Sequence, residues 1–139
     1  MFYGEYNHTI DAKGRLFIPA KLREKLGEEF IVARVFDKCI CVYPTDEWER
    51  FTEKLESLPI AKDRRVRRYY YANASEATVD AQGRVTISQP NREYASLEKD
   101  VVIVGSRSHL EIWSADAWNK EISGIDCDKI TEELVELGF

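Results

Sequence analysis

Short apolar runs separated by polar turns recur along the chain and predict a mostly β fold. Four of these runs form two pairs, each joined by a short polar segment: Phe30–Phe36 with Cys39–Tyr43, and Val101–Val104 with His109–Trp113. Apolar runs of this length, bounded by turn residues, are typical of buried strands. We therefore expect two hairpins of similar design, the first turning at Asp37-Lys38.

Helical patterns follow the strand signals. A leading proline and a closing glycine predict a short helix over Ala20–Leu26. Thr45, followed by two acidic residues, is a candidate N-cap for a second helix that reaches Leu58. The apolar residues of that helix recur at helical spacing, at Trp48, Phe51 and Leu55.

An internal repeat is the strongest signal of organisation. Thr9–Ile18 aligns with Thr78–Ile87 at an offset of 69 residues, and both segments contain Asp-Ala-x-Gly-Arg. The match continues from Arg23-Glu24 onto Arg92-Glu93, and later reaches a tryptophan in each copy. Recurrence of order and spacing together indicates a tandem duplication, and two copies are too few for a solenoid.

The duplication divides the chain into four parts. We expect a first repeat over residues 1–60, a basic and aromatic connector helix over 61–75, a second repeat over 76–119 and an acidic helical tail over 120–139. In the connector, Val66, Tyr69 and Tyr70 lie at helical spacing, so one face is apolar. Two interpretations of its arginines remain. The helix docks on the barrel and the arginine side chains extend from it into solvent, or they contact phosphates or an acidic partner.

Composition places the chain among globular proteins. Its 139 residues are 44% hydrophobic, 12% aromatic and 32% charged, which excludes a large multidomain enzyme and allows a real core. No apolar run approaches the roughly 18–20 residues of a membrane-spanning helix, so we expect no membrane association. The N-terminus has neither a basic start nor an apolar segment typical of a secretory signal, and we expect a cytoplasmic protein.

The charge distribution matters more than the net charge. A formal net charge of -5 argues, taken whole, against nucleic-acid binding. However, the tail from Lys120 to Phe139 holds six acidic and two basic residues, which leaves the remainder nearly neutral. Basic residues gather in two places, at Lys62–Arg68 and around the first repeated turn, where Lys13, Arg15, Lys21 and Arg23 lie.

The cysteines and histidines predict no metal and no disulfide. Cys39, Cys41 and Cys127 are too few, and odd in number, for a disulfide framework. Strand periodicity puts Cys39 and Cys41 on one face as half-buried filler. His8 and His109 lack the ligand spacing of a zinc site, so we expect no cofactor. No nucleophile–base pair or phosphate-cradling loop is present, so we expect neither an enzyme nor a small-molecule substrate.

Nearly the whole chain resembles the MraZ family of transcriptional regulators, within the AbrB-like class of DNA-binding proteins. The resemblance rests on the duplicated Asp-x-x-Gly-Arg turn, on Ile18-Pro19-Ala20-Lys21-Leu22-Arg23, on the Arg-Arg-Tyr-Tyr-Tyr-Ala-Asn-Ala linker, and on the Tyr-Pro and Ile-Trp strand ends. It implies an α+β, mainly β fold. In that fold two AbrB-like repeats interleave into a pseudo-twofold swapped-hairpin, or double-split, β-barrel with short flanking helices.

The resemblance also implies a function. Several chains would close into a ring, and the turns would contact double-stranded DNA at the promoter of the bacterial division and cell-wall gene cluster, in the nucleoid. Ring assembly would allow DNA binding despite the negative net charge of the chain, because linking several weak contacts raises the overall affinity by roughly 10²–10⁴-fold. It also predicts direct repeats in the target, about one helical turn apart.

The expected DNA-binding residues are Lys13, Gly14, Arg15 and Arg84, with Lys21, Arg64 and Arg68 as further candidates for DNA or phosphate contact. Glycine adopts positive φ cheaply, so Gly14 and Gly83 permit tight turns, and Asp11 and Asp80 are suited to holding them. The alternative for each turn is an intramolecular Asp–Arg pair that needs no ligand, and both uses can coexist. The second turn is less basic, because Gln82 replaces the lysine.

A rival function is an antitoxin-like module that binds a protein partner. It would use the acidic tail, whose apolar residues have the spacing of an amphipathic helix: Ile130, Leu134, Val135 and Leu137. The tail can also dock on its own ring.

Overall fold

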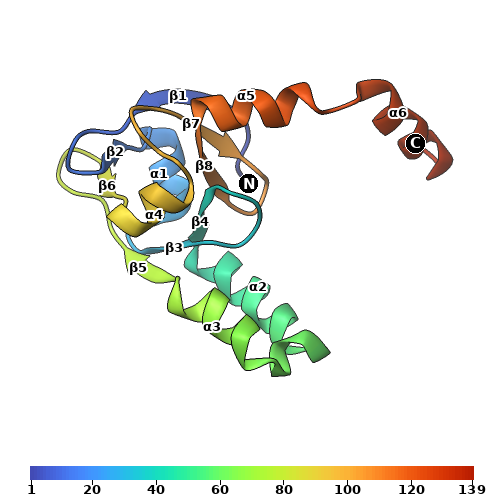
Figure 1. The fold of residues 1–139 in the computed structure, drawn as a ribbon, viewed down its shortest axis with the longest axis horizontal. Coiled ribbons are helices and arrows are strands. Elements are labelled where there is room, and N and C mark those ends of the chain that lie inside the picture. Colours follow the sequence, from blue (N-terminus) through green and yellow to red (C-terminus); the bar gives the residue numbers. More distant parts are fainter.

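A six-stranded antiparallel sheet and a separate two-stranded ribbon carry the fold, with six α-helices around them (Figure 1). The computed structural model describes residues 1–139. The strands are β1 (Glu5–Thr9), β2 (Arg15–Phe17), β3 (Phe30–Ala33), β4 (Ile40–Pro44), β5 (Ser75–Ala77), β6 (Arg84–Thr86), β7 (Asp100–Gly105) and β8 (Leu110–Ser114). The helices are α1 (Ala20–Leu26), α2 (Thr45–Glu56), α3 (Arg64–Ala72), α4 (Gln89–Tyr94), α5 (Ala115–Ser123) and α6 (Cys127–Glu136), with one 3₁₀ helix (Pro59–Lys62).

The expected mixed fold with an antiparallel sheet is present, but several boundaries differ. β3 ends at Ala33 and β4 begins at Ile40, so a six-residue loop replaces the expected two-residue turn. Asp37 has a φ of 58° in that loop. α2 ends at Glu56 rather than Leu58, because a residue before proline is driven to extended backbone and Leu58 adopts it.

The connector is helical over only part of its expected range. The 3₁₀ helix comes first, and α3 then begins at Arg64. Asp63 is its N-cap, and its carboxylate accepts a hydrogen bond of 2.8 Å from the backbone N–H of Arg65. The α2 and α3 pair projects from the body of the molecule (Figure 1).

Strand pairing crosses between the two halves of the sequence. The large sheet has the order β1-β7-β8-β4-β3-β5, so β1 pairs with β7 and β5 pairs with β3. In the ribbon, β2 pairs with β6 and Leu16 lies opposite Val85, its own equivalent at the 69-residue offset. At the centre of the large sheet β4 pairs with β8, with Cys41 opposite Glu111. Each half therefore lends its first strand to the hairpin of the other.

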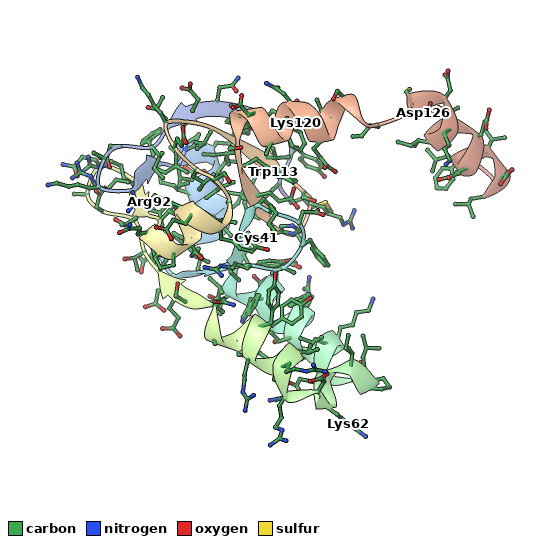
Figure 2. The ribbon with its side chains drawn as sticks, viewed as in Figure 1. Cys41, Lys62, Arg92, Trp113, Lys120 and Asp126 are labelled. Atoms are coloured by element: carbon green, nitrogen blue, oxygen red, sulfur yellow. The ribbon has the colours of Figure 1, made fainter.

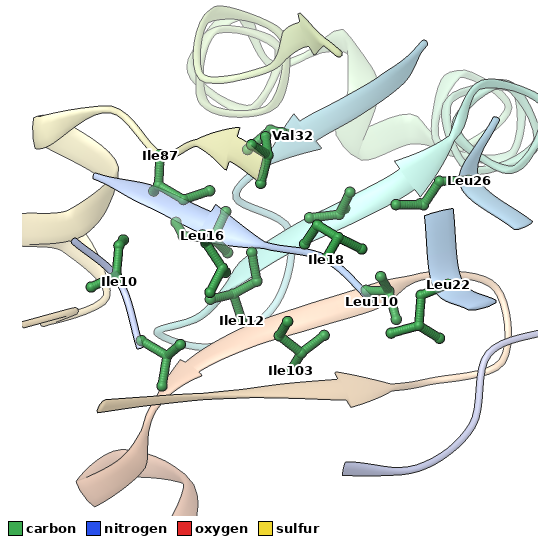
Figure 3. Close-up of a cluster of buried hydrophobic side chains, with 14 of the residues drawn as sticks. Ile10, Leu16, Ile18, Leu22, Leu26, Val32, Ile87, Ile103, Leu110 and Ile112 are labelled. Carbon is green, nitrogen blue, oxygen red and sulfur yellow. The ribbon is translucent and has the colours of Figure 1, made fainter. Parts of the chain in front are cut away.

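The central strands of the large sheet are buried on both faces, because successive apolar residues point to opposite sides of the sheet. One face and the ribbon share a cluster of 18 buried residues drawn from both halves (Figure 3). In β3, Phe30 and Val32 belong to that cluster, whereas Ile31 and Ala33 face the other side. Burial on both faces explains why these strands are nearly continuous apolar runs.

A second cluster of nine buried residues lies on the opposite face of the sheet. Aromatic side chains from three helices cover it: Trp48 and Phe51 of α2, Tyr70 of α3 and Trp118 of α5. Cys39 and Cys41 share this face as expected, but both are fully buried rather than half-buried.

The C-terminal helix α6 stands away from the body of the chain (Figure 1). Every residue from Asn119 to Phe139 is exposed, and the exposed apolar side chains of this segment include Ile130, Leu134, Val135 and Leu137. No helix in the molecule has both the length and the apolar character needed to span a bilayer.

Candidate nucleic-acid interface

The first repeated turn is closed by Asp11. One carboxylate oxygen, Oδ1, accepts hydrogen bonds from the backbone N–H groups of Lys13 (3.0 Å) and Arg15 (2.8 Å). The other, Oδ2, lies 2.6 Å from Nε of Arg15. The backbone N–H of Gly14 donates to the Asp11 carbonyl at 2.9 Å. The aspartate therefore fixes both the turn and the direction of the arginine.

The second turn repeats this geometry around Asp80. Its Oδ1 accepts from the backbone N–H groups of Gln82 and Arg84, both at 2.9 Å, and its Oδ2 lies 2.8 Å from Nε of Arg84. The intramolecular pairing that the sequence allowed is thus present in both turns. Position within the turn does not distinguish Arg15 from Arg84. The two turns differ in a neighbouring residue, which is Lys13 in the first turn and Gln82 in the second.

These hydrogen bonds set the acidity of the two aspartates. Backbone donation from Arg15 is the largest influence that lowers the pKa of Asp11, followed by the Arg15 side chain. Backbone donation from Arg84 does the same for the pKa of Asp80. Both carboxylates therefore remain charged at neutral pH and hold their turns.

Each turn glycine lies under an arginine of the other half. Gly14 has a φ of 81°, and a Cβ there would lie 2.5 Å from the carbonyl oxygen of Ile87 and 2.9 Å from Nε of Arg92. Gly83 has a φ of 78°, and its Cβ would lie 2.7 Å from the guanidinium of Arg23. Only glycine meets both requirements, the positive φ and the close approach.

Arg23 and Arg92 are residues of this region that the sequence interpretation left out of the site. Arg92 donates from Nε to the carbonyl of Ile87 at 3.1 Å, whereas Nε of Arg23 is buried without a partner. The guanidinium of Arg23 lies 5.5 Å from the ring centre of Phe17. The alignment of Arg23-Glu24 with Arg92-Glu93 was the signal that could have identified them.

The two turns lead into opposite ends of the short antiparallel β2–β6 ribbon, because Arg15 lies opposite Thr86 and Arg84 lies opposite Phe17. Figure 1 shows both loops on the side of the molecule where the ribbon lies. Backbone bonds tie each turn to the other strand: the N–H of Ile87 donates to the Gly14 carbonyl at 2.7 Å, and that of Ile18 to the Gly83 carbonyl at 3.0 Å. Leu16 and Val85 point into the core, so Arg15 and Arg84 lie on the outer face of the ribbon.

Both turn arginines keep donors for another molecule. The terminal nitrogens of Arg15 have no hydrogen-bond partner within the chain, and those of Arg84 make one long contact of 3.4 Å with Gln82. Their side chains are 33% and 29% exposed. Lys13 is exposed at the tip of the first turn. A pair of arginine forks thus projects from one ribbon.

The other candidate cations do not all join the turns. Arg64 and Arg68 are exposed on α3, which projects from a different side of the molecule than the ribbon (Figure 1). Figure 2 shows Lys62, at the end of the 3₁₀ helix, far from Arg92, which lies near the turns. Lys21 is exposed in the first turn of α1.

Comparison with known proteins identifies a single family. The sequence profile described as "MraZ protein, putative antitoxin-like" matches residues 1–68 and again residues 70–136. The chain is 46% identical over 140 residues to a protein of Heliobacterium modesticaldum, with 98% of each chain covered. It is also 46% identical to a protein of Lachnoclostridium phytofermentans, and that alignment covers 100% of this chain and 99% of the relative. The identity to a protein of Acetivibrio thermocellus is again 46%, with 100% of both chains covered. All three are named transcriptional regulator MraZ.

Proposed function

The chain belongs to the MraZ family, whose named members are transcriptional regulators and not enzymes, and from this premise we propose that it regulates transcription by binding DNA through its two repeated turns. The observation that carries the proposal is the pair of arginines, Arg15 and Arg84, which lie at the two ends of one short ribbon, on its outer face. Family membership supports the DNA-binding role, and the geometry supports the choice of residues.

The shape of the ribbon suits a DNA groove. The major groove of B-DNA admits a two-stranded β-ribbon, and arginine can form two parallel hydrogen bonds with a guanine edge or a phosphate. Arg15 and Arg84 are held by Nε–carboxylate contacts, so their terminal nitrogens are oriented before DNA arrives. Fixing the donors beforehand reduces the entropy lost on binding.

The first turn is the stronger candidate for reading bases. Its side chains toward solvent are those of Lys13 and Arg15, whereas the second turn offers Gln82 and Arg84. Gly14, expected from the sequence to contact DNA, is buried under Arg92, so its part is to shape the turn. Lysine adds a point charge beside the phosphate backbone that glutamine lacks. Lys21, Arg64 and Arg68 then serve as secondary phosphate contacts.

The crossed strand pairing supports a swapped-hairpin, double-split β-barrel with a pseudo-twofold axis. The axis would pass between Leu16 and Val85 in the ribbon and between Cys41 and Glu111 in the large sheet. Equivalent residues meet at both places, because the repeat offset grows by one residue before the second pair. We divide the chain accordingly into repeats over residues 1–60 and 76–119, a connector over 61–75 and a tail over 120–139.

The protein would act as a homo-oligomeric ring in the cytoplasm, on nucleoid DNA. One ribbon supplies little discrimination, because a good bidentate base contact contributes about 1–3 kcal/mol. A ring that engages several direct repeats at once multiplies such contacts. The target implied by the family is the promoter of the bacterial division and cell-wall gene cluster.

A mobility-shift experiment tests the proposal. The protein is mixed at fixed ionic strength with the DNA upstream of its own gene and with a scrambled duplex of equal length. We expect a shift of the upstream DNA at concentrations at least about tenfold below those needed for scrambled DNA, which corresponds to one lost base contact or more. Equal affinity for the two duplexes would refute sequence-specific binding.

Substitution of the turn arginines then assigns the reading residue. Arg15→Ala is expected to abolish the preference for upstream DNA, because each subunit loses about 1–3 kcal/mol and the loss is repeated around the ring. Arg84→Ala is expected to act mainly through folding or assembly. Oligomer size and melting temperature are measured for both variants. If Arg84→Ala alone loses specificity with assembly intact, the second turn reads the DNA.

The antitoxin-like alternative rests on α6, whose apolar side chains are exposed and whose surface is acidic. It would bind a basic protein partner. Removal of residues 124–139 distinguishes the two functions when light scattering shows that the oligomer is intact. DNA recognition by the turns should then survive in the truncated chain, whereas binding of a basic protein should be lost.

A further inference from the structure

Two cysteines, a histidine and a glutamate meet on the face of the large sheet opposite the ribbon. Cys39 and Cys41 belong to the β4 end of the first hairpin, and His109 and Glu111 to the β8 end of the second. β4 and β8 are paired, with Cys41 opposite Glu111. Residues two apart on a strand share a face, so two short motifs, Cys-x-Cys and His-x-Glu, converge from opposite halves of the chain.

The donor atoms of this cluster are close together. Both cysteine sulfurs and a carboxylate oxygen of Glu111 lie within 4.8 Å of one another. Nε2 of His109 lies 3.3 Å from Oε2 of Glu111, and its ring lies beside the Cys41 thiol. The cysteines are fully buried, and the side chains of His109 and Glu111 are 8% and 15% exposed.

The surrounding residues orient the two ligands from β8. Nδ1 of His109 lies 2.8 Å from the Ser108 hydroxyl, and the ring stacks on Tyr43 with centroids 4.5 Å apart. When Nδ1 donates to Ser108, Nε2 presents its lone pair to the cluster, an outer contact that metal-bound histidines usually make. The indole of Trp113 donates to Oε1 of Glu111 at 3.1 Å, which leaves Oε2 directed at the cluster.

We propose that Cys39, Cys41, His109 and Glu111 form a zinc site that joins the two halves of the chain at the centre of the sheet. Thiolate, imidazole and carboxylate are the three ligand types of protein zinc sites, and four protein ligands are typical of a structural rather than a catalytic ion. Two thiolates disfavour Mg²⁺ and Ca²⁺, and a carboxylate disfavours Cu⁺. This proposal departs from the sequence analysis, which predicted no metal because the histidine is far along the chain from the cysteines and lacks the ligand spacing of a zinc site.

Binding has a defined local chemistry. Each thiol loses its proton to solvent as its sulfur coordinates the ion. The Cys39 thiol then gives up its 3.3 Å hydrogen bond to the Phe36 carbonyl, in the loop between β3 and β4. Cys41 lies in the middle of the molecule, away from Arg92 and the turns (Figure 2). Zinc binding is therefore independent of DNA recognition and can be tested separately.

Cobalt titration tests the site directly. The full-length protein is reduced, stripped with a chelator and titrated with Co²⁺, whose spectrum reports geometry and ligands. We expect one Co²⁺ per chain, visible bands of a tetrahedral site and a thiolate charge-transfer band, all removed when Zn²⁺ displaces cobalt. Zn²⁺ is also expected to raise the melting temperature of the stripped protein. Absence of the charge-transfer band, or an unchanged melting temperature with Zn²⁺, would overturn the proposal.

Matched variants locate the ligands. Cys41→Ser is expected to weaken Co²⁺ binding by more than about 100-fold, beyond the 10–100-fold typical of losing an outer contact, and Ser108→Ala by an amount within that range. Cys127→Ser is the control, since Cys127 is exposed on α6. Circular dichroism checks that each variant is folded. If Cys41→Ser is unfolded, Co²⁺ binding is measured with Glu111→Gln instead. Binding that survives both ligand substitutions, or that is lost in Cys127→Ser, would refute the site.

Discussion

At the scale of single residues, the glycine of each turn is constrained from two directions. Gly14 needs a positive φ, and the space above its α-carbon is filled by the Ile87 carbonyl and the Arg92 side chain. Arg92 can move, but the carbonyl belongs to backbone that is hydrogen-bonded to Gly14 itself. The glycine therefore couples the shape of one turn to the strand of the other half.

Gly14→Ala is expected to destabilise the protein by at least about 2 kcal/mol, because the left-handed conformation alone costs about 1–2 kcal/mol and the contact with Ile87 adds to it. Chemical denaturation followed by circular dichroism measures the change in the free energy of unfolding. Gly124→Ala is the control, since its Cβ would lie no closer than 3.5 Å to the nearest atom. Equal stability of the two variants would contradict the close approach at Gly14.

The turn aspartates predict a dependence of stability on acid pH. The pKa of Asp11 is lowered in the folded state by donation from the Arg15 backbone. Its contribution to the free energy of unfolding is therefore present above its ordinary pKa of about 3.9 and is lost as pH falls through the folded value. Melting temperatures between pH 7 and pH 2 should fall less steeply for the Asp11→Asn, Asp80→Asn double variant than for the wild type. An identical slope would show that the turn carboxylates do not contribute.

At the scale of elements, α3 and the β2–β6 ribbon have separate roles. The ribbon presents oriented arginines, whereas α3 carries exposed arginines on a projecting arm and packs Tyr70 against Phe51 of α2. Arg67 is not available for DNA in the same way, because it pairs with Glu56 at 2.6 Å. Arg64 and Arg68 remain free to contact phosphates, but no aspartate orients them toward base edges as Asp11 and Asp80 orient the ribbon arginines.

Neutralising Arg64 and Arg68 together is expected to weaken DNA binding modestly, by a similar factor for specific and scrambled duplexes. The physical reason is that phosphate contacts act through counterion release, so the slope of affinity against salt should also fall. Fluorescence anisotropy at several salt concentrations measures both. A loss of specificity as large as that of Arg15→Ala, with assembly intact, would place α3 in the recognition surface.

At the scale of the whole molecule, the exposed apolar side chains point to assembly. They concentrate on the arm and the tail, and include Leu58, Ile60, Ile125 and Val135, the last of which is 62% exposed. Apolar faces of this kind are covered when subunits associate. The tail also carries most of the net negative charge and stands apart from the ribbon, so its repulsion of DNA acts at a distance (Figure 1).

We expect the protein to form a homo-oligomer larger than a dimer. Light scattering at micromolar concentration measures its mass, and a monomer near 16.1 kDa would contradict this expectation. Leu134→Glu, Val135→Glu tests the role of the tail, since charges on its apolar face should reduce the mass if α6 lies between subunits. Glu132→Gln is a control on the acidic side of the same helix.

The repeat, the strands and the turn chemistry could be predicted from the sequence because they depend on local patterns: short apolar runs, glycine in the turn and aspartate four residues before arginine. The strand lengths were less accurate, since β3 ends where the Asp37 loop leaves the sheet. Only the tertiary structure decided which strands pair. Crossed pairing places Arg92 over Gly14 and brings His109 to Cys41, contacts between distant residues that no local pattern specifies. Sequence spacing fixes neighbours along a strand, whereas neighbours across the sheet are fixed by burying both of its faces.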